Sequence, residues 1–114
     1  MCQVARADDI LTGANNPVFV AVTPDEVSVV CASEDVPKQT LAVMDGWAML
    51  RVTGPLDFGL VGVIAELSAA LAQASIPIFV TSTYLTDYVM VTQDRLDDAV
   101  STLRAAGNQV ILPL

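Results

Sequence analysis

The stretch from Gly54 to Gly62 carries the residue types best suited to holding a small charged ligand. It reads Gly-Pro-Leu-Asp-Phe-Gly-Leu-Val-Gly and connects an apolar run ending at Thr53 to an apolar-periodic run from Leu60 to Ala74. Proline removes an amide donor, glycine allows conformations closed to other residues, and Asp57 is predicted to cap the helix that follows. Because a helix N-terminus leaves backbone N–H groups free, this turn is predicted to bind a small anion such as a carboxylate.

A free amino acid is a zwitterion, so its site needs donors for the carboxylate and acceptors for the ammonium group. Backbone N–H groups near Gly59 to Gly62 suit the carboxylate, while Asp57 and the carbonyls of a strand around Ile78 to Val80 suit the ammonium group. The candidate ligand-binding residues are Asp57, Phe58, Gly59, Leu60, Val61, Gly62, Ile78, Phe79, Val80, Ser82, Thr83 and Asp87. The alternative is purely structural: Asp57 only caps the helix, and the glycines only permit close packing.

Catalytic and metal chemistry find little support in the composition. The chain has no histidine, so every Ser-His or Cys-His nucleophile pair is excluded. Cys2 and Cys31 are too few for a disulfide framework or a zinc site and are expected to be free thiols. We therefore expect a protein that is not an enzyme and carries no cofactor.

Other acidic and glycine-containing motifs have simpler readings than catalysis. Asp57 and Asp87 are expected to be solvated caps rather than an acid-base pair. The run Asp94, Asp97 and Asp98 fits the first turn of a helix, where acids interact with the helix dipole, better than a metal site. A dinucleotide site is not supported because the Gly-x-Gly-x-x-Gly spacing is absent.

Length and charge limit the partners of this chain. It has 114 residues, enough for one compact domain or two small units, and a net charge of -8 at pH 7. That charge argues against nucleic acid and against anionic membranes. Apolar residues make up 54% of the chain, which favours a partner chain on part of the surface. No apolar run is long enough to span a bilayer and the N-terminus lacks a signal pattern, so a cytoplasmic location is expected.

Residues 1–45 are predicted to form a small β-rich unit. Cys2 to Arg6 fits a short strand and Asp8 to Thr12 a helical turn. Val18 to Thr23 and Glu26 to Ala32 are two strand-forming runs that Pro24-Asp25 joins into a hairpin. A polar connector from Ser33 to Thr40 marks the approach to the domain boundary.

Residues 46–114 show a regular alternation of strand and helix periods. Strands are predicted at residues 47–53, 76–81, 87–92 and 109–112, with helices at residues 60–74 and from Asp94, as N-cap, to Gly107, as C′ residue. The order strand, helix, strand, strand, helix, strand is the ferredoxin-like βαββαβ arrangement of the α+β class, with both helices on one face of a four-stranded antiparallel sheet.

This order, together with three local motifs, resembles an ACT domain. The motifs are Gly54 to Gly62, Ser82 to Tyr88, and Thr23 to Cys31 in an N-terminal, partial ACT-like unit over residues 1–45. They are similar to those of small bacterial ACT proteins related to the CASTOR-type cytosolic arginine sensors. The position of Leu85 is usually acidic in that pattern, so a contact made by that carboxylate is missing here.

The resemblance implies a non-catalytic regulatory protein that binds an amino acid or another small ligand, with the site near an interface between ACT units. In residues 47–53, alternate side chains point to opposite faces of the sheet, and neither set is polar enough to face water on the side without helices. A homodimer that covers this side is therefore expected. The alternative function is a structural, dimerising ACT-like module without a ligand.

Overall fold

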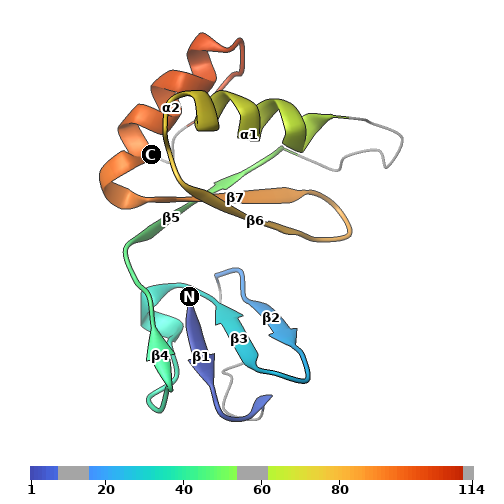
Figure 1. Cartoon of the computed structure of the whole chain (residues 1–114), viewed down its shortest axis with the longest axis vertical. Helices are drawn as coiled ribbons and strands as arrows, with labels where there is room; N and C mark the ends of the chain where they lie inside the picture. Colours follow the sequence, from blue (N-terminus) through green and yellow to red (C-terminus); the bar gives the residue numbers. More distant parts are fainter. Residues whose placement is uncertain (8–15, 54–61, 112–114) are drawn as a thin grey trace. The chain divides into compact units, whose positions relative to one another are not determined.

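The computed structural model describes residues 1–7, 16–53 and 62–111. The chain divides into two compact units, Met1–Asp45 (unit 1) and Gly46–Leu114 (unit 2), each of which is described by itself. In the described part of the chain, seven strands form two antiparallel sheets and two α-helices accompany them (Figure 1). The expected α+β class is confirmed.

Unit 1 is built on a four-stranded sheet in the order β2-β3-β1-β4. The predicted hairpin through Pro24 and Asp25 is confirmed, because Val22 lies opposite Val27 across the two strands it joins. The predicted helical turn at Asp8 to Thr12 lies outside the described residues. The strands are β1 (Cys2–Val4), β2 (Phe19–Val22), β3 (Val27–Val30) and β4 (Ala42–Val43).

One face of this sheet is apolar because strand side chains alternate between the two faces. Cys2, Val4 and Val29 are buried at its centre, and Val36 from the connector packs against them. Ser28 belongs to the opposite face, where its hydroxyl donates to a carboxylate oxygen of Glu26. The small core of unit 1 therefore lies on one side of its sheet.

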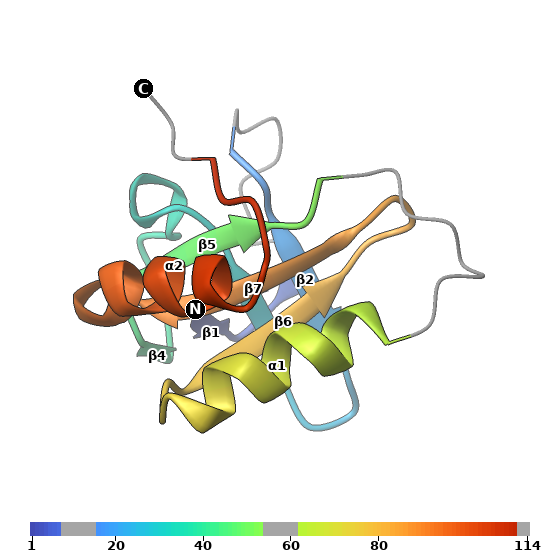
Figure 2. The same cartoon turned by 90° about the horizontal axis from the view of Figure 1, so that it is seen from above.

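Unit 2 combines a three-stranded sheet in the order β5-β7-β6 with two helices on one of its faces (Figures 1 and 2). Leu71 of α1 and Val91 of β7 are fully buried between the layers. The elements are β5 (Trp47–Arg51), α1 (Val63–Gln73), β6 (Ile78–Ser82), β7 (Asp87–Thr92) and α2 (Leu96–Ala105).

The alternation within β5 assigns its residues to two faces. Ala48 and Leu50 pack against the core beneath the helices. Trp47 points to the other face, where its ring meets that of Phe79 edge-on at a centroid distance of 4.6 Å. Aromatic side chains thus occupy the helix-free face of the sheet.

The predicted fourth strand, residues 109–112, is wrong over residues 109–111, which are not in a strand, while Leu112 lies outside the described residues. The Val110 side chain packs against the helix-covered core. The Val110 carbonyl accepts a hydrogen bond from Arg104 Nη2 at 2.8 Å. This segment is therefore tied to the end of α2 by a side-chain contact.

The predicted helix starts also need correction. The N-cap of α1 is Gly62, so this position does not belong to Asp57, which lies outside the described residues. The N-cap of α2 is Arg95, and Asp94 lies instead in a short 3-10 helix, Gln93–Arg95, that precedes α2. Neither N-cap makes a side-chain capping bond.

The predicted end of α2 is confirmed. Gly107 adopts φ = 98° just beyond the helix, and its N–H donates to the Arg104 carbonyl at 3.0 Å. Asn108 N–H donates to the Leu103 carbonyl at 3.0 Å. This pair of bonds is the Schellman motif that satisfies the last carbonyls of a helix.

Candidate functional site

The turn between β6 and β7 is held by threonine hydrogen bonds. Thr83 N–H donates to the Thr86 carbonyl at 2.8 Å, and the Thr83 hydroxyl donates to the same carbonyl at 3.2 Å. Thr86 N–H in turn donates to Thr83 Oγ1 at 3.3 Å. In this way the threonine side chain forms hydrogen bonds with backbone groups of the turn that would otherwise bond to water, and these bonds stabilise the turn.

Thr86 also fixes the end of β5. Its hydroxyl donates to the Val52 carbonyl at 2.6 Å, and Val52 N–H donates to the Asp87 carbonyl at 3.0 Å. Thr86 is a buried polar residue, 7% exposed. The chain therefore leaves β5 toward residues 54–61 from a point held against the β6–β7 turn.

A serine and a carboxylate face each other beside this turn. Ser82 and Asp87 are opposite residues of β6 and β7, and Ser82 Oγ donates to Asp87 Oδ1 at 2.5 Å. Asp87 shares the parity of Val89, whose side chain lies in the helix-covered core, so the pair belongs to the helix side of the sheet. Asp87 begins a strand, so the expectation that it caps a helix is wrong. The serine bond engages Oδ1 of Asp87 and leaves Oδ2 outside this bond.

The outer edge of β6 presents backbone donors and acceptors. Opposed residues in an antiparallel pair alternate between those that exchange both backbone hydrogen bonds and those that exchange none. Because Thr83 N–H bonds to Thr86, the pairs of Ser82, Val80 and Ile78 with β7 are of the second kind. Their N–H and C=O groups point away from β7, and no other described strand pairs with this edge.

The N-terminus of α1 lies at the same end of unit 2 as the β6–β7 turn and the end of β5 (Figures 1 and 2). The first intrahelical bond runs from Glu66 N–H to the Gly62 carbonyl, so the N–H groups of residues 63–65 precede the helical ladder. Gly62 has φ = 87°, a conformation that favours glycine, and a Cβ there would meet nothing within 4 Å. This helix end is therefore a suitable place for an anion.

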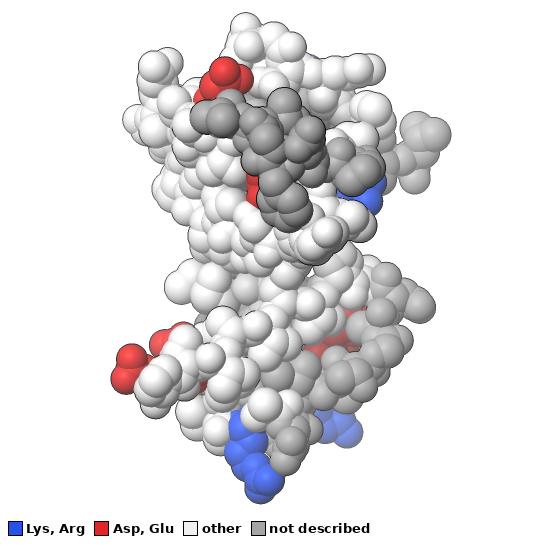
Figure 3. Space-filling model, turned by 90° about the vertical axis from the view of Figure 1, so that its right-hand side faces the viewer, with Lys and Arg blue, Asp and Glu red and all other residues white. Residues whose placement is uncertain are grey.

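The surface seen at this end of unit 2 is mostly uncharged among the residues drawn as described (Figure 3). The charged residues described at this end are Asp87 at the start of β7, Glu66 in the first turn of α1 and Arg51 at the end of β5. In the described ranges, no group of three or more His, Cys, Asp or Glu residues is placed to hold a metal ion.

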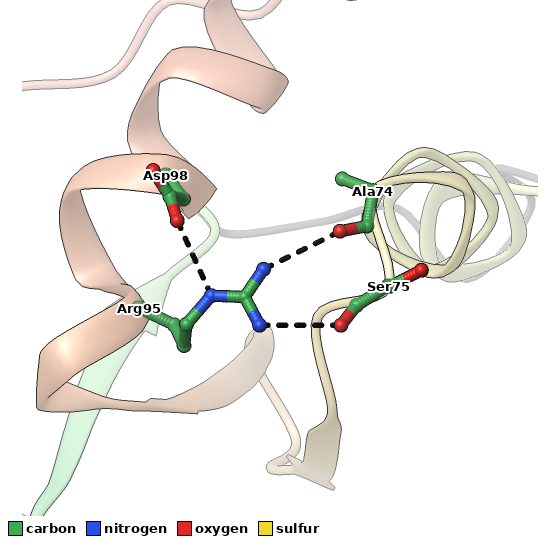
Figure 4. A network of polar contacts seen from close by, with 4 residues as sticks. All are labelled: Ala74, Ser75, Arg95 and Asp98. Atoms are coloured by element: carbon green, nitrogen blue, oxygen red, sulfur yellow. Dashed lines mark hydrogen bonds and ion pairs between the residues drawn. The ribbon is translucent and has the colours of Figure 1, made fainter.

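The opposite end of α1 is fixed by Arg95, the residue preceding α2 (Figure 4). Its Nη1 and Nη2 donate to the carbonyls of Ser75 and Ala74, each at 3.3 Å, and its Nε pairs with Asp98 Oδ2 at 3.2 Å. A guanidinium group at the C-terminus of a helix interacts favourably with the helix dipole. Arg95 therefore helps to hold α1, and with it the N-terminus at the candidate site.

The twelve predicted ligand-binding residues fall into three groups. Asp57, Phe58, Gly59, Leu60 and Val61 lie outside the described residues. Gly62, Ser82, Thr83 and Asp87 lie at the end of unit 2 where α1 begins. On β6, Ile78 and Val80 share the helix-covered side, whereas Phe79 turns its ring to the other face against Trp47.

Thr86 is the residue that sequence reasoning missed. Its hydroxyl joins the β6–β7 turn to Val52, close to where residues 54–61 begin, yet a threonine in a polar turn is usually exposed. The only signal in the sequence is the repeated threonine of Thr83 to Thr86, which suggests a side-chain-bonded turn but not its contact with Val52.

No helix in the described segments is long and apolar enough to cross a membrane.

Comparisons with known proteins agree with this fold. A family model for the ACT domain matches residues 42–105. The crystal structure of the protein Atu0741 from Agobacterium tumefaciens is similar over 99% of this chain and 85% of that chain, with 26% sequence identity and a TM-score of 0.86. Because the family match covers more than half of its length, the chain belongs to the ACT domain family.

Proposed function

We propose that this protein is a non-catalytic regulatory protein that binds an amino acid at the strand–helix turn of unit 2. ACT domains generally bind small-molecule ligands in a regulatory role. The amino acid, the absence of catalysis and the relation to the CASTOR-type sensors are part of this proposal, as is a cytoplasmic location.

The observation that carries the proposal is the convergence of complementary polar groups at one end of unit 2. The N–H groups at the start of α1 suit a carboxylate. Asp87 suits an ammonium group, as do those outward carbonyls of β6 that the homodimer proposed below leaves unpaired. Residues Asp57 to Val61, which connect β5 to Gly62, are proposed to complete the site.

The test is calorimetric titration of the whole chain with each of the twenty amino acids, preceded by a thermal-shift screen. A ligand that binds the folded state raises the unfolding temperature according to its occupancy. We expect binding that Asp57→Ala weakens without loss of fold. Asp97→Asn, in the first turn of α2, is a matched control that should bind normally. Absence of binding to every amino acid would remove the proposal.

We further propose a homodimer joined along β6, which would bring the ligand site close to an interface. The outward N–H and C=O groups of Ile78, Val80 and Ser82 support this assembly, because an exposed strand edge is a template for pairing. The same edge also favours the second candidate function, a dimerising module without a ligand. The titration distinguishes the two functions, since only the first predicts heat of binding.

A further inference from the structure

The two units repeat the same strand arrangement. In unit 1 the third strand, β3, lies between β1 and β2, and in unit 2 the third strand, β7, lies between β5 and β6. The β2–β3 hairpin of unit 1 and the β6–β7 hairpin of unit 2 can be aligned without gaps, so that corresponding residues are a constant number of positions apart in the sequence. Corresponding residues that are identical are Phe19 and Phe79, Val20 and Val80, Thr23 and Thr83, and Val29 and Val89.

The hairpin turns repeat the same hydrogen bonds. Thr23 N–H donates to the Glu26 carbonyl at 2.9 Å, as Thr83 N–H donates to the Thr86 carbonyl at 2.8 Å. The Thr23 hydroxyl donates to the Glu26 carbonyl at 3.1 Å and accepts from Glu26 N–H at 3.1 Å. These are the bonds that Thr83 makes in unit 2. The two hairpins are therefore structural counterparts.

The counterparts differ in one chemically important pair. Val22 and Val27 face each other in unit 1 where Ser82 and Asp87 face each other in unit 2. Val22 is 66% exposed, whereas Val27 packs against the small core of unit 1. Glu26 does not replace the lost carboxylate, because its side chain accepts from Ser28 on the opposite face of the sheet. Unit 1 thus has the hairpin without the anionic group.

We propose that each chain has a single ammonium-binding site, in unit 2, and that the Ser82–Asp87 pair distinguishes it from the apolar counterpart in unit 1. This inference rests on the proposed function and specifies it. The serine hydroxyl holds one oxygen of Asp87, which leaves the other oxygen to accept from a cationic group. Ligands are accordingly amino acids or primary amines, and carboxylic acids that lack the ammonium group do not bind comparably.

The experiment is calorimetric titration of the full chain with the twenty amino acids and with propionate, the analogue of alanine without its ammonium group. We expect one amino acid bound per chain and no measurable binding of propionate. Asp87→Asn keeps the size of the side chain and removes its charge. It should weaken amino acid binding more than about tenfold, because hydrogen bonds to charged groups contribute more than neutral ones.

Two matched variants separate this inference from a general effect on folding. Val22→Ser changes the counterpart of Ser82 on the exposed surface of unit 1. It should leave both the affinity and the number of amino acids bound per chain unchanged. Ser82→Val with Asp87→Val gives unit 2 the hairpin pair of unit 1 and should abolish binding while the chain keeps its circular dichroism spectrum. Two ligands per chain, normal affinity in Asp87→Asn, or equal binding of propionate would overturn the inference while leaving a binding function. Absence of binding by any amino acid would instead overturn the proposed function and this inference together.

Discussion

At the scale of single residues, Thr86 links the β6–β7 turn to the end of β5. Its buried hydroxyl satisfies the Val52 carbonyl at the end of β5. Thr86→Val keeps the shape of the side chain and leaves that carbonyl without this donor. Because Val52 is half-buried, we expect the free energy of unfolding to fall by about 1 kcal/mol, the net contribution of a typical hydrogen bond.

Urea denaturation followed by circular dichroism measures this loss. Thr86→Ser retains the hydroxyl and is the matched control, so it should be clearly more stable than Thr86→Val. Equal stability of the two variants would show that the bond to Val52 contributes little.

Cys31 gives the stability of unit 1 a dependence on alkaline pH. Burial raises the pKa of its thiol above the ordinary value, and the neighbouring Cys2 raises it further. The folded state therefore holds the thiol proton more tightly than the unfolded state. The resulting stability is fully present below the unfolded pKa, about 8.5, and is lost as the pH rises through the higher folded pKa.

Comparing the chain with Cys31→Ala under reducing conditions isolates this contribution. We expect the parent chain to lose stability relative to Cys31→Ala as the pH rises above about 8.5, as measured by the unfolding free energies of the two proteins. Groups remote from Cys31 titrate equally in the two proteins and cancel. A difference that stays constant through the alkaline range would contradict the assignment to the Cys31 thiol.

At the scale of elements, the two helices end in the same motif with different residues. Beyond α1, Ser75 adopts φ = 60°, and its N–H donates to the Ala72 carbonyl at 2.9 Å, while Ile76 N–H donates to the Leu71 carbonyl at 3.0 Å. Beyond α2, Gly107 holds the corresponding position. A left-handed conformation costs a residue with a side chain about 1 kcal/mol or more, and glycine is nearly free of this cost.

The difference predicts opposite effects of two substitutions. Ser75→Gly should stabilise the chain by up to about 1 kcal/mol, whereas Gly107→Ala should destabilise it by about 1 kcal/mol. Chemical denaturation of both variants beside the parent measures the pair. Destabilisation by Ser75→Gly would mean that the greater freedom of glycine in the unfolded chain outweighs the relief of strain.

The elements themselves were largely predictable because their periodicity is local. Leu67 and Leu71 recur at helical spacing and pack on one face, and the hairpin of unit 1 follows from two strand-forming runs around Pro24. The helix starts were not predictable from capping preference. Arg95 becomes the N-cap of α2 and bonds to the end of α1, a contact between segments far apart in the sequence.

In the candidate site, too, local features were predictable from the sequence and contacts between distant segments were not. The opposition of Ser82 and Asp87 follows from a short hairpin turn, so their closeness was within reach of sequence reasoning. The bond from Thr86 to Val52 joins the β6–β7 turn to the residue that follows β5, and the sequence pattern alone does not determine that these segments are neighbours. The fourth predicted strand failed over residues 109–111 because the Val110 carbonyl bonds to a side chain, Arg104, rather than to a strand.

At the scale of the whole molecule, the proposed homodimer is tested by a backbone substitution at the edge of β6. The Val80 N–H points away from β7, so Val80→Pro removes no hydrogen bond of the β6–β7 pair. Proline does remove an outward donor and discourages pairing with another strand. We expect the parent chain to sediment as a dimer and Val80→Pro as a monomer with an unchanged circular dichroism spectrum.

Val20→Pro is the matched control, because Val20 occupies the counterpart position at the edge of β2 and its N–H also points outward. If the dimer forms along β6, Val20→Pro should remain a dimer at concentrations where Val80→Pro has dissociated. If only Val20→Pro dissociates the dimer, the interface lies in unit 1 instead, and a monomeric parent chain would contradict the dimer proposal altogether.

Because dimerisation follows mass action, a ligand bound near β6 that contacts both copies should also lower the concentration needed for the dimer. Repeating the sedimentation with a saturating amino acid therefore tests whether assembly and ligand binding are coupled.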